Sequence, residues 1–113
     1  MKMNLRFNAL KVAELEKTFN QPIENIISDM RLDTLATIVS KGYVDEENDK
    51  VGCSISVAYD KITEYLKESE NGKQDLVLDI IDEFIEEGFL PKAMKNTREI
   101  VNNKMKEVQT LMN

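Results

Sequence analysis

Apolar and polar residues alternate over the first eight positions of the chain. The apolar members are Met3, Leu5 and Phe7, and each is flanked by polar side chains. This period of two is typical of a strand with one buried face. The sequence therefore predicts a short N-terminal strand over residues 2–7.

The pattern then changes to helical spacings, with apolar residues three, four and seven positions apart. Six stretches show it: residues 9–19, 22–28, 32–42, 55–66, 73–87 and 91–112. In residues 55–66 the apolar stripe consists of Ile55, Ala58, Tyr59, Ile62, Tyr65 and Leu66. The predicted fold is mostly α: a compact bundle of five to six helices, with the short strand and a longer C-terminal helix. We expect a single domain over residues 1–113, with its core in residues 5–90 and an amphipathic helix at 91–112.

Capping residues set the expected ends of several helices. Asn8 and either Ser54 or Ser56 can accept a hydrogen bond from an early unpaired backbone N–H. Gly42 and Gly88 can end the third and fifth helices in the left-handed conformation.

The start of the fourth helix has a second interpretation. Apolar residues alternate over positions 51–57 as well, which is the period of a strand. Such a strand would pair with residues 3–7.

The composition is that of a folded protein without membrane spans. Of the 113 residues, 42% are hydrophobic and 32% are charged, a balance unlike that of disordered chains. No apolar run approaches the roughly 18 residues that cross a bilayer, and the N-terminus lacks a signal-peptide core. Cys53 is the single cysteine, which agrees with a reducing compartment. We therefore expect a cytoplasmic protein that does not contact membranes.

Charge is segregated along the chain, whose net value is −6. Six basic and five acidic residues give +1 over residues 1–44, four and fourteen give −10 over 45–90, and five and two give +3 over 91–113. Nucleic acid requires a clustered basic footprint, which is missing, so we expect no DNA or RNA binding. The acidic middle either balances the basic C-terminal segment within the molecule or binds a basic partner.

The segment DEENDKVG, residues 45–52, has the composition of a calcium-binding loop. Counted from Asp45, such a loop needs Gly at its sixth position and Glu at its twelfth. Lys50 and Ser56 occupy those positions. The sequence therefore predicts a solvated connector and no metal site.

Five carboxylates follow the fifth helix at spacings that place them on one face. They are Asp75, Asp79, Asp82, Glu83 and Glu86. An exposed row of this kind lacks the cleft that a catalytic carboxylate pair needs. The row is therefore either a solvated face or a docking face for a basic partner.

Other conventional chemistry is missing from the sequence. The chain has no His, and Cys53 has no second Cys with which to share a metal. We expect Cys53 to be a small buried apolar residue. The sequence predicts no catalytic residues, no cofactor and no small-molecule substrate, and hence a protein that is not an enzyme.

The last predicted helix has one apolar side. Its members are Met94, Val101, Met105, Val108 and Met112. Flexible methionines suit a surface that adapts to a partner helix. The same side can instead pack against the chain's own core.

The chain resembles the tail assembly chaperones of long-tailed phages and prophages in four ordered blocks: LRFNALKVAELEKTFNQPIENI, LDTLATIVSKGYV, SISVAYDKITEYLKES and DLVLDIIDEFIEEGFL. The blocks lie between residues 5 and 90, about three quarters of the chain, and leave the C-terminal helix outside. Members of that family are small, acidic, mostly helical proteins of the host cytoplasm that are absent from the mature virion. The resemblance implies a non-enzymatic chaperone that binds the helical tape measure protein and helps to recruit tail tube subunits.

In this interpretation, the partner contacts either the apolar side from Met94 to Met112 or the acidic face from Asp75 to Glu86. Two other classes fit the same patterns. A DNA-mimicking decoy would occupy the binding surface of a basic regulator through the carboxylate row. A self-associating structural subunit, a homo-oligomer, would pair through the N-terminal strand or the C-terminal helix.

Overall fold

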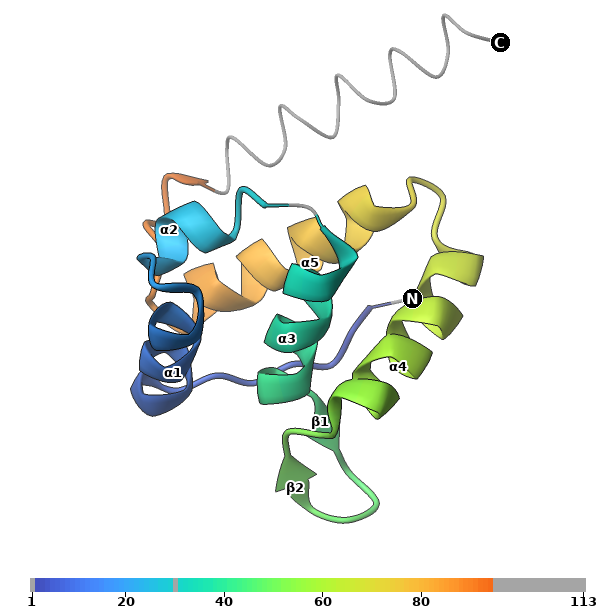
Figure 1. Cartoon of the computed structure of the whole chain (residues 1–113). Coiled ribbons are helices and arrows are strands. Elements are labelled where there is room, and N and C mark those ends of the chain that lie inside the picture. Colours follow the sequence, from blue (N-terminus) through green and yellow to red (C-terminus); the bar gives the residue numbers. More distant parts are fainter. Residues whose placement is uncertain (1, 30, 95–113) are drawn as a thin grey trace, which may run out of the picture.

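The computed structural model describes residues 2–29 and 31–94, which form five helices and a two-stranded antiparallel sheet (Figure 1). The helices are α1 (Ala9–Phe19), α2 (Ile23–Ile26), α3 (Leu32–Gly42), α4 (Ile55–Glu68) and α5 (Lys73–Glu86), and the strands are β1 (Val44–Asp45) and β2 (Lys50–Val51). The prediction of a mostly α bundle with a short strand is confirmed. From residue 95 onward, the predicted C-terminal helix lies outside the described residues.

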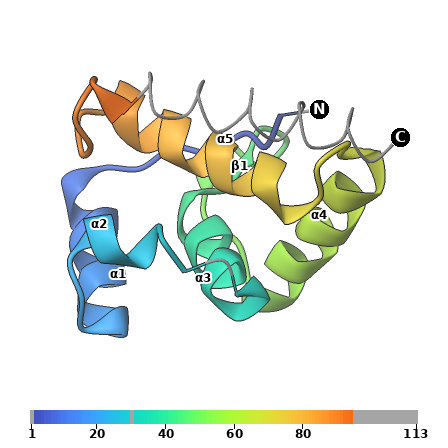
Figure 2. The same ribbon diagram turned by 90° about the horizontal axis from the view of Figure 1, so that it is seen from above.

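Helix α5 lies across a row formed by α1, α3 and α4 (Figures 1 and 2). Its buried side chains are Leu76, Val77, Leu78, Ile80, Phe84 and Ile85. Because these residues cover more than one side of a helix, α5 buries a wider arc than a surface helix does.

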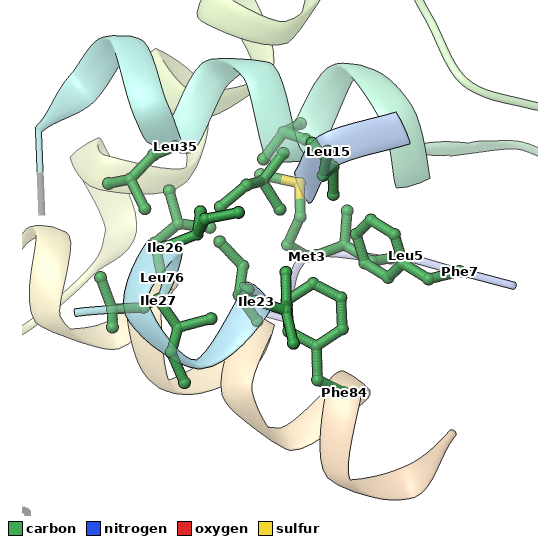
Figure 3. Close-up of a cluster of buried hydrophobic side chains, with 14 of the residues drawn as sticks. Met3, Leu5, Phe7, Leu15, Ile23, Ile26, Ile27, Leu35, Leu76 and Phe84 are labelled. Atoms are coloured by element: carbon green, nitrogen blue, oxygen red, sulfur yellow. The ribbon is translucent and has the colours of Figure 1, made fainter. Parts of the chain in front are cut away.

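One hydrophobic core joins the described segments. Figure 3 shows side chains of the N-terminal segment, α1, α2, α3 and α5 converging, among them Met3, Leu5, Phe7, Leu15, Ile23, Leu35 and Phe84. The ring centroids of Phe7 and Phe84 are 4.7 Å apart. Burial of each large apolar side chain contributes about 1.5–3 kcal/mol, so the N-terminal segment is a structural part of the core.

The N-terminal segment is extended, and its alternating burial is as predicted. Met3, Leu5 and Phe7 are buried, whereas the residues between them are exposed. Its regular pairing is limited to one antiparallel bridge, between Leu5 and Tyr43. The backbone N–H of Arg6 donates to the carbonyl of Gly42 at 2.8 Å.

The alternative pairing of residues 51–57 with residues 3–7 is wrong. Val51 pairs with Val44 in the β1–β2 hairpin, and the chain is helical from Ile55 onward. The Ser54 side chain accepts from the N–H of Val57 at 3.2 Å, so Ser54 rather than Ser56 caps α4. This cap fixes the helix where alternation alone allowed a strand.

Two glycines expected to end helices differ in role. Gly88 follows α5 with a φ of 90°, as the left-handed position requires. Gly42, the last residue of α3, does not have a positive φ, and the C-cap Tyr43 has a φ of −59°. A Cβ at position 42 would lie 2.3 Å from Cζ of Phe7. Gly42 therefore makes room for the Phe7 ring, and its predicted left-handed conformation is wrong.

Candidate protein-binding surfaces

Asp75, the first carboxylate of the predicted row, bonds to the turn between α4 and α5. Its oxygens accept from the Ser69 hydroxyl at 2.7 Å and from the backbone and side-chain N–H groups of Asn71 at 3.1 and 3.0 Å. Burial raises the pKa of Asp75, but the hydrogen bonds from Ser69 and Asn71 outweigh it and hold the pKa below its ordinary value. Asp75 thus stabilises the fold as an anion.

Asp79 joins three segments of the chain. Its Oδ2 accepts from the backbone N–H of Met3 at 3.2 Å and from the Tyr65 hydroxyl at 2.8 Å. Met3 belongs to the N-terminal segment and Tyr65 to α4, where its side chain is buried. Asp79 is therefore an internal acceptor.

Glu87, just after α5, plays the same role at the other end of the N-terminal segment. Its Oε2 accepts from the backbone N–H of Phe7 at 2.8 Å. Burial raises the pKa of Glu87; the Phe7 N–H opposes the shift, and the nearby Glu83 adds to it, so the net direction is upward. The predicted row of carboxylates does not include Glu87.

The spacing of these acceptors matches the extended chain. Met3 and Phe7 are four residues apart, about 13 Å in an extended segment. Asp79 and Glu87 are eight residues apart, about 12 Å along a helix. The N-terminal segment therefore runs beside α5 with its donors in register with two carboxylates. The match between these two spacings was the feature of the sequence that could have indicated the role of Glu87.

The other members of the predicted row differ in exposure. Asp82 and Glu83 are half-buried, and Glu86 is exposed. Together with the bonded Asp75 and Asp79, they do not form a uniformly solvated face. Asp75 and Asp79, the first two carboxylates of the row, accept hydrogen bonds within the molecule and so stabilise the fold.

Of the predicted apolar side, only its first residue is described. Met94 is half-buried and packs against the main core. Val101, Met105, Val108 and Met112 lie outside the described residues.

The acidic segment after α3 is a hairpin rather than only a connector. Asp45 accepts from the backbone N–H and the side-chain amide of Asn48 at 3.2 and 2.7 Å, and these bonds lower the pKa of Asp45. Gly52 has a φ of 108°, as its turn requires. Within residues 2–29 and 31–94, no group of three His, Cys, Asp or Glu side chains is placed to hold a metal ion.

An open pocket of about 650 Å³ lies between the hairpin and the first two turns of α4. Its lining is mostly polar and includes Asn4, Tyr43, Cys53, Val57 and Lys61. The Lys61 ammonium lies 5.7 Å from the centroid of the Tyr43 ring. Cys53 is half-buried, and burial raises the pKa of its thiol. A thiol that stays protonated is a poor nucleophile.

Helix α4 exposes two apolar residues of its predicted stripe. Ile55 and Tyr59 lie one turn apart, and 47% and 42% of their surfaces are exposed. The prediction that they belong to the buried stripe is therefore wrong, although Ala58, Ile62 and Tyr65 are buried as expected.

Helix α3 packs beside α4 and carries a third exposed apolar residue. The Ser40 hydroxyl donates to the carbonyl of Cys53 at 2.6 Å, so the end of α3 that holds Ser40 meets the start of α4. Leu32, at the other end of α3, is 44% exposed, and Ala36 between them is buried. We name Leu32, Ile55 and Tyr59 the α3–α4 strip.

Comparison with known proteins indicates no function, so the function has to be inferred from the chain's own residues. None of the described helices is long and apolar enough to cross a membrane. We found no match between the chain and any family model, curated protein or solved structure.

Proposed function

We propose that the protein is a non-enzymatic assembly chaperone for phage tails. It acts in the host cytoplasm, binds the helical tape measure protein and helps to recruit tail tube subunits, and it is absent from the mature virion. The α3–α4 strip is the binding surface that we assign to the tape measure protein.

The order of the four sequence blocks carries this proposal, because each block contains most or all of one or two helices of the fold. The first block covers the N-terminal segment from Leu5 with α1 and α2, and the second covers α3 and Val44. The third is α4 with its cap Ser54, and the fourth runs from the first turn of α5 to Leu90. The resemblance therefore follows the elements that build the core.

The physics of the α3–α4 strip agrees with a helical partner. A tape measure protein exposes long apolar helices before the tube encloses it, and an amphipathic helix binds in an apolar groove or strip. Helix α4 has 14 residues, a length of about 21 Å. Complete burial of the exposed parts of Ile55 and Tyr59 would contribute about 1 kcal/mol each, which suits a transient complex.

The internal hydrogen bonds of α5 favour this class over the DNA-mimicking decoy. A decoy needs carboxylates that are open to a basic surface, whereas Asp75 and Asp79 already accept bonds within the molecule. A self-associating subunit, expected from the sequence to pair through the N-terminal strand or the C-terminal helix, can also bury the α3–α4 strip between two copies. The oligomeric state therefore has to be measured alongside partner binding.

Co-expression with the tape measure protein encoded in the same genome tests the proposal. The double variant Ile55→Glu, Tyr59→Glu should lose both co-purification and the soluble fraction of the partner. The matched control is Leu10→Glu on α1, where the apolar side chain is 67% exposed, and it should behave as the wild type. Light scattering shows whether the strip instead joins two copies of the chain.

A separate variant tests the apolar side of the C-terminal segment. Val101→Asp with Met105→Asp removes that surface. If partner binding and solubility stay unchanged in this still-folded protein, the C-terminal apolar side is not the docking site. Loss of binding here, with Ile55→Glu, Tyr59→Glu unaffected, would contradict our assignment to the α3–α4 strip.

A further inference from the structure

The turn between α4 and α5 (Figure 1) contains Asn71 and Gly72, the only Asn-Gly pair in the sequence. Asparagine is one of the chemically labile residues of proteins. A Gly after it increases this lability, because no Cβ hinders the approach of the next backbone nitrogen to the side-chain amide. Both residues are half-buried, and a Cβ at position 72 would meet no atom beyond its chain neighbours within 4 Å. Water therefore has access to the pair.

Asp75 holds Asn71 through two hydrogen bonds. Its Oδ1 accepts from the side-chain amide of Asn71 at 3.0 Å, and its Oδ2 accepts from the backbone N–H of the same residue at 3.1 Å. Any rotation of the amide away from Asp75 breaks the first of these bonds, which is made to a charged group and is stronger than a neutral one. The folded turn therefore keeps the amide of Asn71 in one orientation.

The reaction open to this pair needs only the chain and water. The backbone nitrogen of Gly72 forms a bond to Cγ of Asn71, the bond from Cγ to Nδ2 breaks, and the proton of Gly72 leaves with the nitrogen as ammonia. Water then opens the resulting succinimide ring. Cleavage of the new bond at Cγ gives Asp, whereas cleavage at the backbone carbonyl carbon gives isoaspartate. Negative charge develops on the amide oxygen during the first step, and the Asp75 carboxylate disfavours it.

Both products disturb the start of α5. A carboxylate at position 71 cannot donate the bond that Oδ1 of Asp75 accepts, and it adds a second negative charge beside Asp75. Isoaspartate also lengthens the backbone by one carbon just before Gly72. The carbonyl of Gly72 accepts from the N–H of Asp75 at 3.2 Å, a bond of the first helical turn. The product chain therefore no longer fits the turn.

We propose that Asn71 is a site of deamidation whose rate the fold controls. Asp75 slows the reaction while the turn is closed, opening of the turn releases the amide, and conversion then prevents the turn from closing as before. Deamidation of Asn71 thus records, irreversibly, how often the α4–α5 turn has opened. The inference concerns the chain itself and does not rest on the proposed function.

Peptide mapping by mass spectrometry on the full-length protein tests the inference. Samples are incubated at neutral pH in native buffer and in guanidinium chloride, and electron-transfer fragmentation separates isoaspartate from Asp. In the denaturant, Asn71 should convert before any other asparagine. In the native protein it should convert at least about tenfold more slowly, the factor expected for one hydrogen bond to a charged group.

Two variants assign the protection to Asp75. Asp75→Ala removes the acceptor of the Asn71 amide, so Asn71 should convert at least about tenfold faster than in the native wild type. Ser69→Ala is the matched control, because it removes another hydrogen bond to Asp75 and leaves both bonds from Asn71 in place. Its rate should stay close to that of the wild type. Circular dichroism shows that each variant is folded during the incubation.

Three outcomes would overturn the inference. The first is an equal rate for Asn71 in the native and the denatured wild type, a measurement that does not depend on the folding of any variant. The second is faster conversion of another asparagine in the denatured chain. The third is a folded Asp75→Ala protein in which Asn71 converts as slowly as in the wild type. None of these outcomes bears on tape measure binding through the α3–α4 strip.

Discussion

In Gly42→Ala, the higher helix propensity of Ala opposes a steric clash with Phe7 in the core. We predict that the clash has the larger effect on the free energy of unfolding. In a helix, replacing Gly by Ala gains about 1 kcal/mol. Here the new Cβ would lie 2.3, 2.5 and 2.8 Å from three ring atoms of Phe7. Overpacking of this kind costs about 1–3 kcal/mol.

The Phe7 ring cannot move away from that clash without a loss of stability. Phe7 is 4% exposed and lies against Phe84, with centroids 4.7 Å apart. Moving it toward solvent gives up part of the roughly 2–3 kcal/mol that its burial contributes. We therefore expect Gly42→Ala to lower the free energy of unfolding by about 2 kcal/mol.

Urea unfolding measures this change, and a double-mutant cycle assigns it to Phe7. In a Phe7→Leu background the clash is relieved, so the effect of Gly42→Ala should shrink by at least about 1 kcal/mol. Thr63→Ala on α4, at an exposed position, is the control and should change stability by no more than about 0.5 kcal/mol. A Gly42→Ala protein that is more stable than the wild type, with no coupling to position 7, would refute the packing argument.

Three further predictions concern carboxylates on α5 and just after it. Asp79→Ala removes the carboxylate that accepts from the N–H of Met3 and from the hydroxyl of Tyr65, so urea unfolding should show a loss of about 2–3 kcal/mol; an unchanged midpoint would contradict this role. Glu87→Gln keeps an acceptor for Phe7 and removes a charge whose pKa is raised from 4.5. Because the raised pKa favours the protonated form in the folded protein, stability falls as pH rises above 4.5, and the Gln variant should be the more stable protein at pH 7, with a flatter pH profile. Asp75 has a lowered pKa, so its contribution is present above its ordinary value of 3.8 and is lost as pH falls through the folded pKa; Asp75→Asn should be destabilised at pH 7, and the difference from wild type should shrink in thermal unfolding at low pH.

Elements with a local signal could be predicted from the sequence. Burial in a strand or a helix repeats with the geometry of the element itself, so the alternation of Met3, Leu5 and Phe7 and the helical periods were sufficient. The caps Asn8 and Ser54 act within three residues of themselves. Local chemistry therefore placed the helices and most of the core.

Contacts between distant residues could not be predicted in the same way. The bond from Phe7 to Glu87 spans 80 positions, and the matched spacing of donors and carboxylates indicates this bond only once the N-terminal segment is known to lie beside α5. Gly42 has the sequence context of a helix end, but the Phe7 ring decides its role. Ile55 and Tyr59 follow the period of the buried stripe, and their exposure depends on where α3 lies.

The β1–β2 hairpin was not predicted from the sequence, for a related reason. Its strands have two residues each, too short for alternation to show. Val44, which pairs with Val51, donates its N–H to the carbonyl of Asn4 at 3.0 Å, so the hairpin also contacts the N-terminal segment, a distant part of the sequence. The pocket beside it depends on this pairing and could not be predicted either.

The affinity of the purified protein for its tape measure protein tests the central claim most directly. Isothermal titration calorimetry should show binding by the wild type and a loss of at least about tenfold for Ile55→Glu, Tyr59→Glu, since about 1.4 kcal/mol corresponds to a factor of ten. Leu10→Glu should bind within about twofold of the wild type. A wild-type protein that does not bind, or a strip variant that binds as tightly as the Leu10 control, would contradict the claim.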